Sequence, residues 1–229
     1  WEILPTQNDN YFIKERFDKE FLNTSYNLYQ FFLYVKRLPL YMPFIEENLE
    51  KNNVPLDFKY LPIAESALKE DVVSGAWAAW IWQFMPETAR EYWLIVNSEI
   101  DERYNFEKST IAAIKYLNYL HTIFKDWTLV AASYNRWQNW IKNALKSQEV
   151  TSYYDLILNE ETSRYVFKIL AIKYVLKEYE HKKIYINTLI WWTYKPFKTK
   201  TITLNKNDDL QKYCKDNNID YLEFKTLNR

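Results

Sequence analysis

The chain has almost no glycine. One glycine occurs in 229 residues, where an average usage of about 7% would give roughly 16. Tryptophan, normally among the rarest residues, occurs ten times. Glycine supplies positive φ angles in tight turns, and a bulky side chain is poorly suited to replace it there. The shortage of one residue and the excess of the other therefore suggest a common cause.

Other shortages narrow the possible functions. The single cysteine, Cys214, cannot form an internal disulfide, and with only two histidines a zinc site of His and Cys ligands is not expected. Thirty basic residues balance thirty acidic ones, so no net charge attracts nucleic acid or an anionic membrane. No apolar run approaches the roughly 20 residues of a membrane span. No signal-like segment is visible, and we expect that the natural start lies before Trp1.

Helical periodicity dominates the part of the chain before about residue 197. Residues 17–68 read as helices broken at four prolines, Pro39, Pro43, Pro55 and Pro62. The spacing of apolar residues predicts further helices over 105–124, 126–135 and 159–180, with Asn105 and Asp126 as caps. Pro86 suits the first position of another helix. The main body is predicted to be all-helical.

The end of the chain has a different pattern. Residues 197–204 form a short β-prone run, and residues 207–219 and 220–228 form two short helical patterns with polar caps. Polar residues fill the connection around 193–208. We place a boundary there.

Glu65 stands out among the residues that could carry chemistry. It lies in the otherwise apolar stretch "YLPIAESAL", where a carboxylate has either a structural partner or a raised pKa. Asp101 and Arg103 read as a local ion pair. Ser66 lacks the glycines of a nucleophile elbow and reads as a structural serine.

The order of short motifs identifies a family. Glu65-Ser66 is followed by "VSGAWAAWIWQFMPETA", "DERYNFEKSTIAAIKYL", "DWTLVAASYN" and "ETSRYVFKIL". From about residue 28 to about 180 this series resembles the lytic transglycosylases of the soluble-lytic-transglycosylase (SLT) type, especially their membrane-bound D branch. That family has a Glu-Ser pair, a "GxxGLWQFMP" loop, an "AAYN" motif and an "ET..YV" helix.

The resemblance implies a mainly α fold in three parts. Residues 1–27 would be an N-terminal extension, and 28–187 a lysozyme-like catalytic domain of the goose-type/SLT class. Residues 188–229 would be a linker and a partial LysM-like module, a small α+β unit that lacks its last strand. The module is suggested by "NDDL" in place of that family's "GDTL".

The implied activity is cleavage of the β-1,4 bond between N-acetylmuramic acid and N-acetylglucosamine in peptidoglycan, without water, to give 1,6-anhydromuramoyl ends. Such an enzyme is a carbon–oxygen lyase acting on polysaccharides. Glu65 would act as acid and then as base, with the substrate's N-acetyl group in place of a second carboxylate. Two alternatives stay open: a lysozyme-like muramidase that uses water, and a non-catalytic wall-binding protein.

The resemblance also implies a set of residues that bind the glycan, without metal or organic cofactor. Tyr134 is the best candidate to hydrogen-bond near Glu65. Glu161 would position the muramoyl sugar or cap a helix, and Ser66 is given no chemical step. The partner would be peptidoglycan glycan strands rather than nucleic acid, and the protein a monomer in the cell envelope, periplasmic or extracellular, with a membrane anchor left open. The predicted substrate-binding residues are Ser66, Ser74, Gln83, Phe84, Tyr134, Asn135 and Glu161.

The glycine shortage now has an explanation to test. The family has glycine at positions occupied here by Trp77, Trp80, Trp93, Trp137 and, in some variants, Trp140. Trp82 and Trp127 instead match family tryptophans. We hypothesise that the gene comes from a bacterium that reads UGA as glycine and was translated with UGA as tryptophan. The alternative is a genuine aromatic platform for sugars. Trp1, Trp191 and Trp192 have no assignment.

Overall fold

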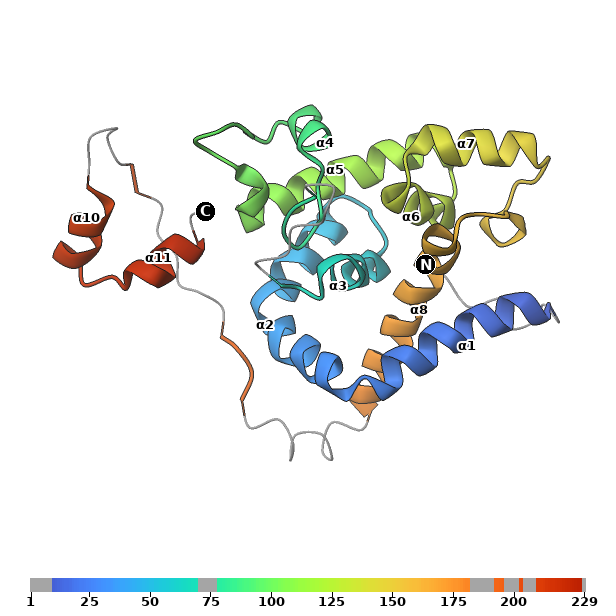
Figure 1. Cartoon of the computed structure of the whole chain (residues 1–229), viewed down its shortest axis with the longest axis horizontal. Coiled ribbons are helices and arrows are strands. Elements are labelled where there is room, and N and C mark those ends of the chain that lie inside the picture. Colours follow the sequence, from blue (N-terminus) through green and yellow to red (C-terminus); the bar gives the residue numbers. More distant parts are fainter. Residues whose placement is uncertain (1–9, 70–77, 182–191, 196–201, 204–208, 228–229) are drawn as a thin grey trace.

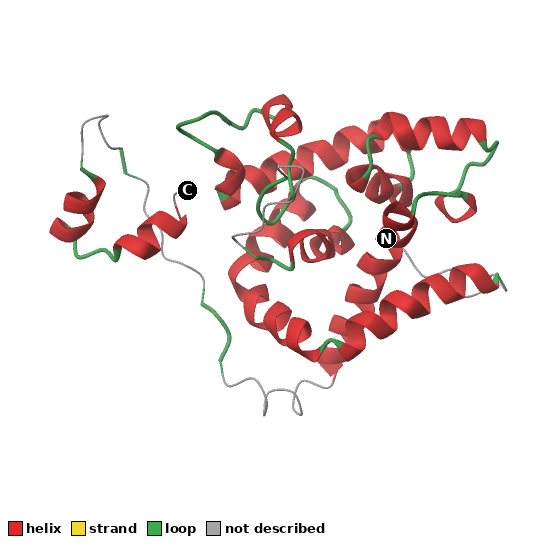
Figure 2. Cartoon of the chain, viewed as in Figure 1, coloured by secondary structure: helices red, strands yellow, loops and turns green. Residues whose placement is uncertain are grey.

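The computed structural model describes residues 10–69, 78–181, 192–195, 202–203 and 209–227 (Figure 1). Within these ranges the chain is helical and contains no strand, only two isolated β-bridges (Figure 2). The prediction of a mainly helical chain is confirmed. The α-helices of the body are α1 (Tyr11–Tyr26), α2 (Leu28–Lys51), α3 (Leu61–Ser66), α4 (Pro86–Glu91), α5 (Phe106–Phe124), α6 (Trp127–Asn135), α7 (Gln138–Ser147) and α8 (Glu160–His181). Three short 3₁₀ helices are η1 (Leu56–Tyr60), η2 (Glu102–Tyr104) and η3 (Tyr153–Asp155).

The capping residues expected from the sequence begin the helices as predicted. Asn105 accepts a hydrogen bond from the backbone N–H of Lys108 at the start of α5. Asp126 accepts one from the N–H of Leu129 at the start of α6. Pro86 is the first residue of α4. These contacts satisfy N–H groups that have no partner within the helix.

The prediction that Pro39 and Pro43 break the chain into separate helices is wrong. Helix α2 runs through both prolines, from Leu28 to Lys51. A proline inside a helix costs about 3 kcal/mol or more. One face of α2 is buried along its length, which offsets that cost. Its buried residues are Phe31, Tyr34, Val35, Tyr41, Met42, Ile45, Asn48 and Leu49.

The N-terminal extension packs onto the body. Helix α1 lies along α8 (Figure 1). Glu20 of α1 is buried and forms an ion pair with Arg164 of α8. The rings of Phe17 and Tyr174 meet edge to face, with their centroids 5.7 Å apart. Residues 11–26 therefore share the core of the helical body.

The tail contains two short helices, α10 (Leu210–Asp216) and α11 (Tyr221–Leu227). They confirm the two helical patterns predicted there, and Asp209 caps α10. Most of the predicted strand over 197–204 lies outside the described residues, and the described part of the tail has no strand. A LysM-like α+β arrangement is therefore not confirmed.

Candidate active site

Glu65 lies near the end of α3, a helix of six residues whose other side chains are almost all buried. Pro62 fits the first turn of α3, and Ala67 ends the helix in the left-handed conformation, with φ of 57°. The short helix thus holds the carboxyl of Glu65 at the edge of the core, where it is partly buried.

The strongest contact of Glu65 comes from α8. The hydroxyl of Tyr165 donates a hydrogen bond to Oε1 of Glu65, and Tyr165 is itself buried. One turn further along α8, the ammonium of Lys168 bonds the carbonyl of Ala64. Helix α8 therefore fixes both the acid and the backbone beside it.

Burial raises the pKa of Glu65 from 4.5 to about 7. The hydrogen bond from Tyr165 and the charge of Lys168 act in the opposite direction, and the nearby charge of Glu161 adds to the rise. A carboxyl with this pKa is present in both protonation states near neutral pH. It can therefore give a proton and take one back.

Tyr134 lies close to the acid, but its proton is used elsewhere. Its hydroxyl donates to the carbonyl of Trp82 over 2.8 Å, and its ring packs against Phe84 and Tyr116 at 6.3 and 5.5 Å. Burial, and then the charge of Glu65, raise its pKa well above the usual 10, so it stays neutral. The structure thus gives the direct contact with Glu65 to Tyr165, not to Tyr134.

Sequence reasoning missed Tyr165, although a signal was available. Tyr165 follows Glu161 by four residues in "ETSRYV", so the two share one face of α8. A residue on the face that carries a predicted site residue is a candidate for the same site. Only the glutamate of this motif was considered.

Asn135 and Glu161, two of the predicted site residues, are brought together by a hydrogen bond. The amide nitrogen of Asn135 donates to Oε1 of Glu161 over 3.0 Å, and Thr162 donates to the amide oxygen of Asn135 over 3.0 Å. These bonds fix the end of α6 against the start of α8. The exposed Glu161 keeps one carboxylate oxygen for other contacts.

The segment 78–84, which we call the IWQF loop after residues 81–84, is held by side chains through its carbonyl groups. The hydroxyl of Ser66 lies 3.1 Å from the carbonyl of Ile81 and 3.1 Å from that of Pro62, and its one proton serves one of them at a time. The side-chain amide of Gln83 donates to the carbonyl of Trp80 over 2.6 Å. Ser66 is therefore a buried brace between α3 and the loop.

The backbone near Glu65 is unusual. Four non-glycine residues, two directly after α3 and two in the IWQF loop, have φ between 49° and 62°: Ala67, Leu68, Trp80 and Gln83. Such conformations cost of order 1–3 kcal/mol each for residues with a Cβ atom, and they gather at functional sites. Ser74 lies outside the described residues, and Phe84 is buried.

The tryptophans at expected glycine positions fall into two groups. Trp80 and Trp93 have left-handed backbones, with φ of 62° and 65°. Trp137 has φ of −41° and precedes α7, and Trp140 lies within α7. Trp77 lies outside the described residues. The backbone therefore favours glycine at 80 and 93, and not at 137 or 140.

The tryptophans that match family tryptophans have structural contacts. The indole of buried Trp82 donates to the hydroxyl of Thr110 over 3.0 Å. Trp127 stacks on His121 with ring centroids 4.0 Å apart. Both belong to the packing of α5 with its neighbours.

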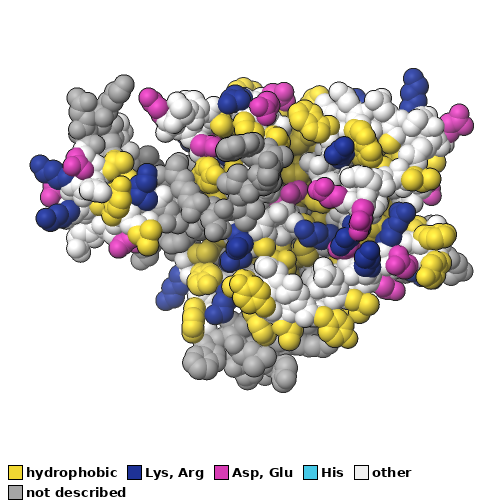
Figure 3. All heavy atoms as spheres, viewed as in Figure 1, with side chains coloured by type: hydrophobic (Ala, Val, Ile, Leu, Met, Phe, Trp, Pro, Cys, Tyr) yellow, Lys and Arg dark blue, Asp and Glu magenta, His cyan; other side chains and the backbone are white. Residues whose placement is uncertain are grey.

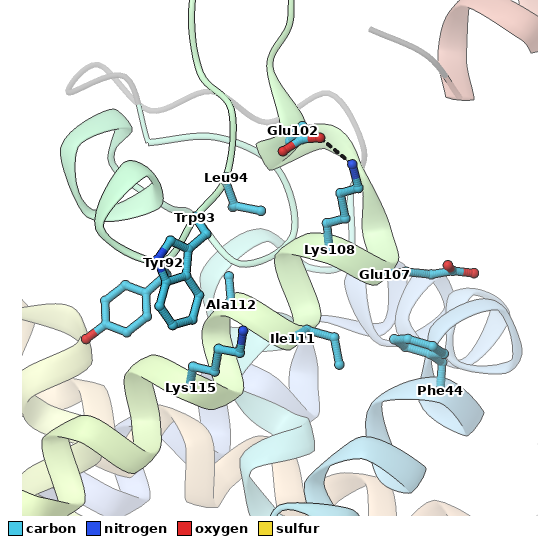
Figure 4. A pocket seen from close by; sticks show the side chains of 10 residues that line it. All are labelled: Phe44, Tyr92, Trp93, Leu94, Glu102, Glu107, Lys108, Ile111, Ala112 and Lys115. Atoms are coloured by element: carbon cyan, nitrogen blue, oxygen red, sulfur yellow. Dashed lines mark hydrogen bonds and ion pairs between the residues drawn. The ribbon is translucent and has the colours of Figure 1, made fainter. Parts of the chain in front are cut away.

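A pocket of about 360 Å³ lies over the first half of α5, away from the acid (Figure 4). Trp93 forms one wall, and the ammonium of Lys115 lies 4.2 Å from the centre of its ring. Glu102 and Lys108 form an ion pair at the rim. None of the predicted site residues lines it. Its lining is Phe44, Tyr92, Trp93, Leu94, Glu102, Glu107, Lys108, Ile111, Ala112 and Lys115.

Charged side chains of both signs are mixed on the face shown in Figure 3. Among the described residues there is no group of three or more His, Cys, Asp or Glu side chains that could hold a metal ion. The same part of the chain has no helix with the length and apolar character needed to cross a membrane.

Comparison with known protein families identifies the family of the chain. The Transglycosylase SLT domain matches residues 42–157, which is just over half of the chain and includes Glu65, the IWQF loop and α6. The chain belongs to this SLT family. Tyr165, the partner of the acid, lies just beyond the matched segment.

Two curated relatives that are similar to the chain are membrane-bound lytic murein transglycosylases D from two strains of Escherichia coli. Each is 36% identical over 176 residues, which is 75% of this chain and 38% of the relative. The chain thus spans less than two fifths of these relatives. The X-ray structure of an inactive mutant of the lytic transglycosylase Slt from Pseudomonas aeruginosa has a TM-score of 0.49 and 19% identity, over 64% of this chain and 25% of that one.

Proposed function

We propose that this SLT-family protein is a peptidoglycan lytic transglycosylase with Glu65 as its catalytic acid and base. The observation that carries the proposal is the partly buried carboxyl of Glu65, held by Tyr165 in apolar surroundings with a pKa of about 7. The family match and the names of the curated relatives support the same activity. The proposed substrate is the glycan strand of peptidoglycan.

The reaction needs only one carboxyl group. Protonated Glu65 gives its proton to the glycosidic oxygen as the bond from C1 of N-acetylmuramic acid breaks. The substrate's own N-acetyl group stabilises the positive charge at C1. The carboxylate then takes the proton of the C6 hydroxyl, whose oxygen attacks C1 and closes the 1,6-anhydro ring. Glu65 ends protonated, as it began.

The other site residues would bind and orient the glycan. Tyr165 holds the carboxyl of Glu65 in one rotamer, while Asn135 and Glu161 offer polar groups near the muramoyl sugar. Gln83 would contact the glycan from the IWQF loop, while buried Ser66 and half-buried Tyr134 hold that loop in place.

Analysis of the sugar ends after digestion of purified peptidoglycan tests the proposal. We expect 1,6-anhydromuramoyl ends. Free reducing ends would instead identify a lysozyme-like muramidase, and intact strands a non-catalytic wall-binding protein. A pH profile adds a second criterion: kcat/KM should fall as the pH rises above about 7, because the protonated fraction of Glu65 then falls.

Replacing the acid gives the most direct test of its role. We expect Glu65→Gln to lower turnover by about 10²–10⁴-fold, since the amide can neither donate a carboxylic proton nor act as a base. Glu50→Gln, a change of an exposed carboxylate on α2, is the control and should leave turnover unchanged. If Glu65→Gln kept half of the parent's turnover, Glu65 would not be the catalytic acid and base.

We further propose that the tail is a LysM-like module that adds affinity for the wall, and that the protein acts as a monomer in the cell envelope. The tail proposal is supported by the sequence pattern and the two helices α10 and α11. Deletion of residues 197–229 should weaken sedimentation with insoluble peptidoglycan and spare turnover of short soluble glycans. Equal loss on both substrates would instead make the tail part of the catalytic fold.

A further inference from the structure

Arg103 is a buried cation that joins two segments of the chain. Its side chain is 7% exposed. Its Nε and Nη2 atoms donate to both carboxylate oxygens of Asp101, the shortest bond being 2.7 Å. Its Nη1 atom donates to the carbonyl of Phe84 over 2.9 Å. The guanidinium thus connects η2 with the end of the IWQF loop.

The carbonyl of Phe84 closes that loop. It also accepts the backbone N–H of Ala79 over 3.1 Å, which brings the two ends of the segment 79–84 together. A hydrogen bond from a charged donor is roughly twice as strong as one between neutral groups. Arg103 therefore stabilises the closed form of the loop from inside the protein.

The IWQF loop connects Arg103 with the residues of the candidate active site. Gln83, beside Phe84, is held at φ of 49°. The ring of Phe84 packs on Tyr134, whose hydroxyl bonds Trp82 in the middle of the loop. The charge of Glu65 in turn acts on Tyr134. A shift of Phe84 would therefore displace Gln83 and Tyr134 together.

We propose that Arg103 is a positioning residue for glycan binding. It holds the IWQF loop closed through the carbonyl of Phe84 and so places Gln83 on the glycan, which Arg103 itself does not touch. Asp101 orients the guanidinium so that Nη1 points at this carbonyl. The inference rests on the proposed function, because it concerns how the same site binds its glycan.

Arg103→Lys is the informative variant. A lysine keeps the positive charge, but its single ammonium lacks the planar fork that spans Asp101 and Phe84 in fixed geometry. We expect faster hydrogen exchange at the Ala79 amide. We also expect affinity for a soluble peptidoglycan glycan, measured in the Glu65→Gln background so that nothing is cleaved, to fall on the order of tenfold.

Lys173→Gln provides a control for lost stability alone. Lys173 forms a buried ion pair with Asp57 over 2.8 Å, between α8 and η1, and has nearly the same exposure as Arg103. This variant should lower the melting temperature without changing Ala79 exchange or glycan affinity. Arg103→Lys should change both even at temperatures well below its own melting temperature.

Two outcomes would overturn the inference: unchanged Ala79 exchange in Arg103→Lys, or faster exchange with unchanged glycan affinity. If Arg103→Lys does not fold, Asp101→Asn replaces it. That change weakens the hydrogen bonds that orient Arg103, so it should also make hydrogen exchange at the Ala79 amide faster. If the parent neither binds nor cleaves the glycan, the proposed function fails, and the exchange measurement still decides whether Arg103 holds the loop.

Discussion

Two segments carry tryptophan where the resemblance to the SLT family leads us to expect glycine, and their backbones differ. In the IWQF loop, Trp80 has φ of 62°. At the junction of α6 and α7, Trp137 has an ordinary φ of −41° and Trp140 is helical. A demand for glycine is therefore present in the first segment and absent from the second. One explanation for all five tryptophans must be tested one position at a time.

Side-chain burial divides the left-handed positions further. Trp80 is 7% exposed and meets Phe106 edge to face at 6.0 Å, whereas Trp93 is 75% exposed. The indole of Trp80 thus contributes to the core, and that of Trp93 contributes little. Among the four of these tryptophan positions that the structure describes, backbone and side-chain burial together favour glycine only at Trp93.

The largest effect is expected at Trp80. Trp80→Ala removes a buried ring and keeps a Cβ atom in a left-handed conformation, so we expect a loss of about 3–5 kcal/mol in unfolding free energy. Trp80→Gly loses the same ring but relieves about 1 kcal/mol of backbone strain. Chemical denaturation of both variants gives the difference. If the alanine variant were as stable as the glycine variant, the backbone at position 80 would not favour glycine.

The difference in stability between the glycine and alanine variants should have opposite signs at Trp93 and Trp140, and both differences should be smaller than the loss at Trp80. At Trp93, glycine should be about 1 kcal/mol more stable than alanine, because φ is 65°. At Trp140, inside α7, glycine should be about 1 kcal/mol less stable than alanine. Thermal unfolding of the four variants measures both signs. The same sign at both positions would contradict the comparison.

The smallest effect is expected at Trp137. Its φ is accessible to any residue, and its side chain is 63% exposed. The glycine and alanine variants should therefore differ in unfolding free energy by less than about 0.5 kcal/mol there.

Mass spectrometry of the natural protein tests the recoding hypothesis directly. Glycine at 80 and 93 would support it, and tryptophan at all five positions would restore the aromatic platform.

Much of the fold follows from local chemistry that the sequence displays. Asn105 and Asp126 begin helices because their side chains accept the backbone N–H three residues ahead. The apolar neighbours of Glu65 in the sequence make it a candidate, and these neighbours are indeed buried, whereas its role as the acid comes from the resemblance to the SLT family. Such features depend on residues close together in the chain.

The remaining features depend on contacts between distant residues. Pro39 and Pro43 stay within α2 because packing of the whole helix outweighs their local cost. Tyr165 hydrogen-bonds to Glu65 across 100 positions of the sequence. The hydroxyl of Tyr134 donates its hydrogen bond to the carbonyl of Trp82 rather than to Glu65. Arg103 was expected to form a local pair with Asp101. That pair is confirmed, but its bond to Phe84 could not be seen in the sequence.

The environment of Glu65 also has a thermodynamic consequence. Its pKa rises from 4.5 to about 7 on folding, so the folded protein binds this proton more tightly than the unfolded chain does. The resulting stabilisation is fully present below pH 4.5 and is lost as the pH rises through about 7. The contribution of Glu65 alone to the free energy of unfolding is thus roughly 3 kcal/mol smaller at high pH than in acid. The residue proposed to cleave the glycan thus also lowers the stability of the fold when it loses its proton.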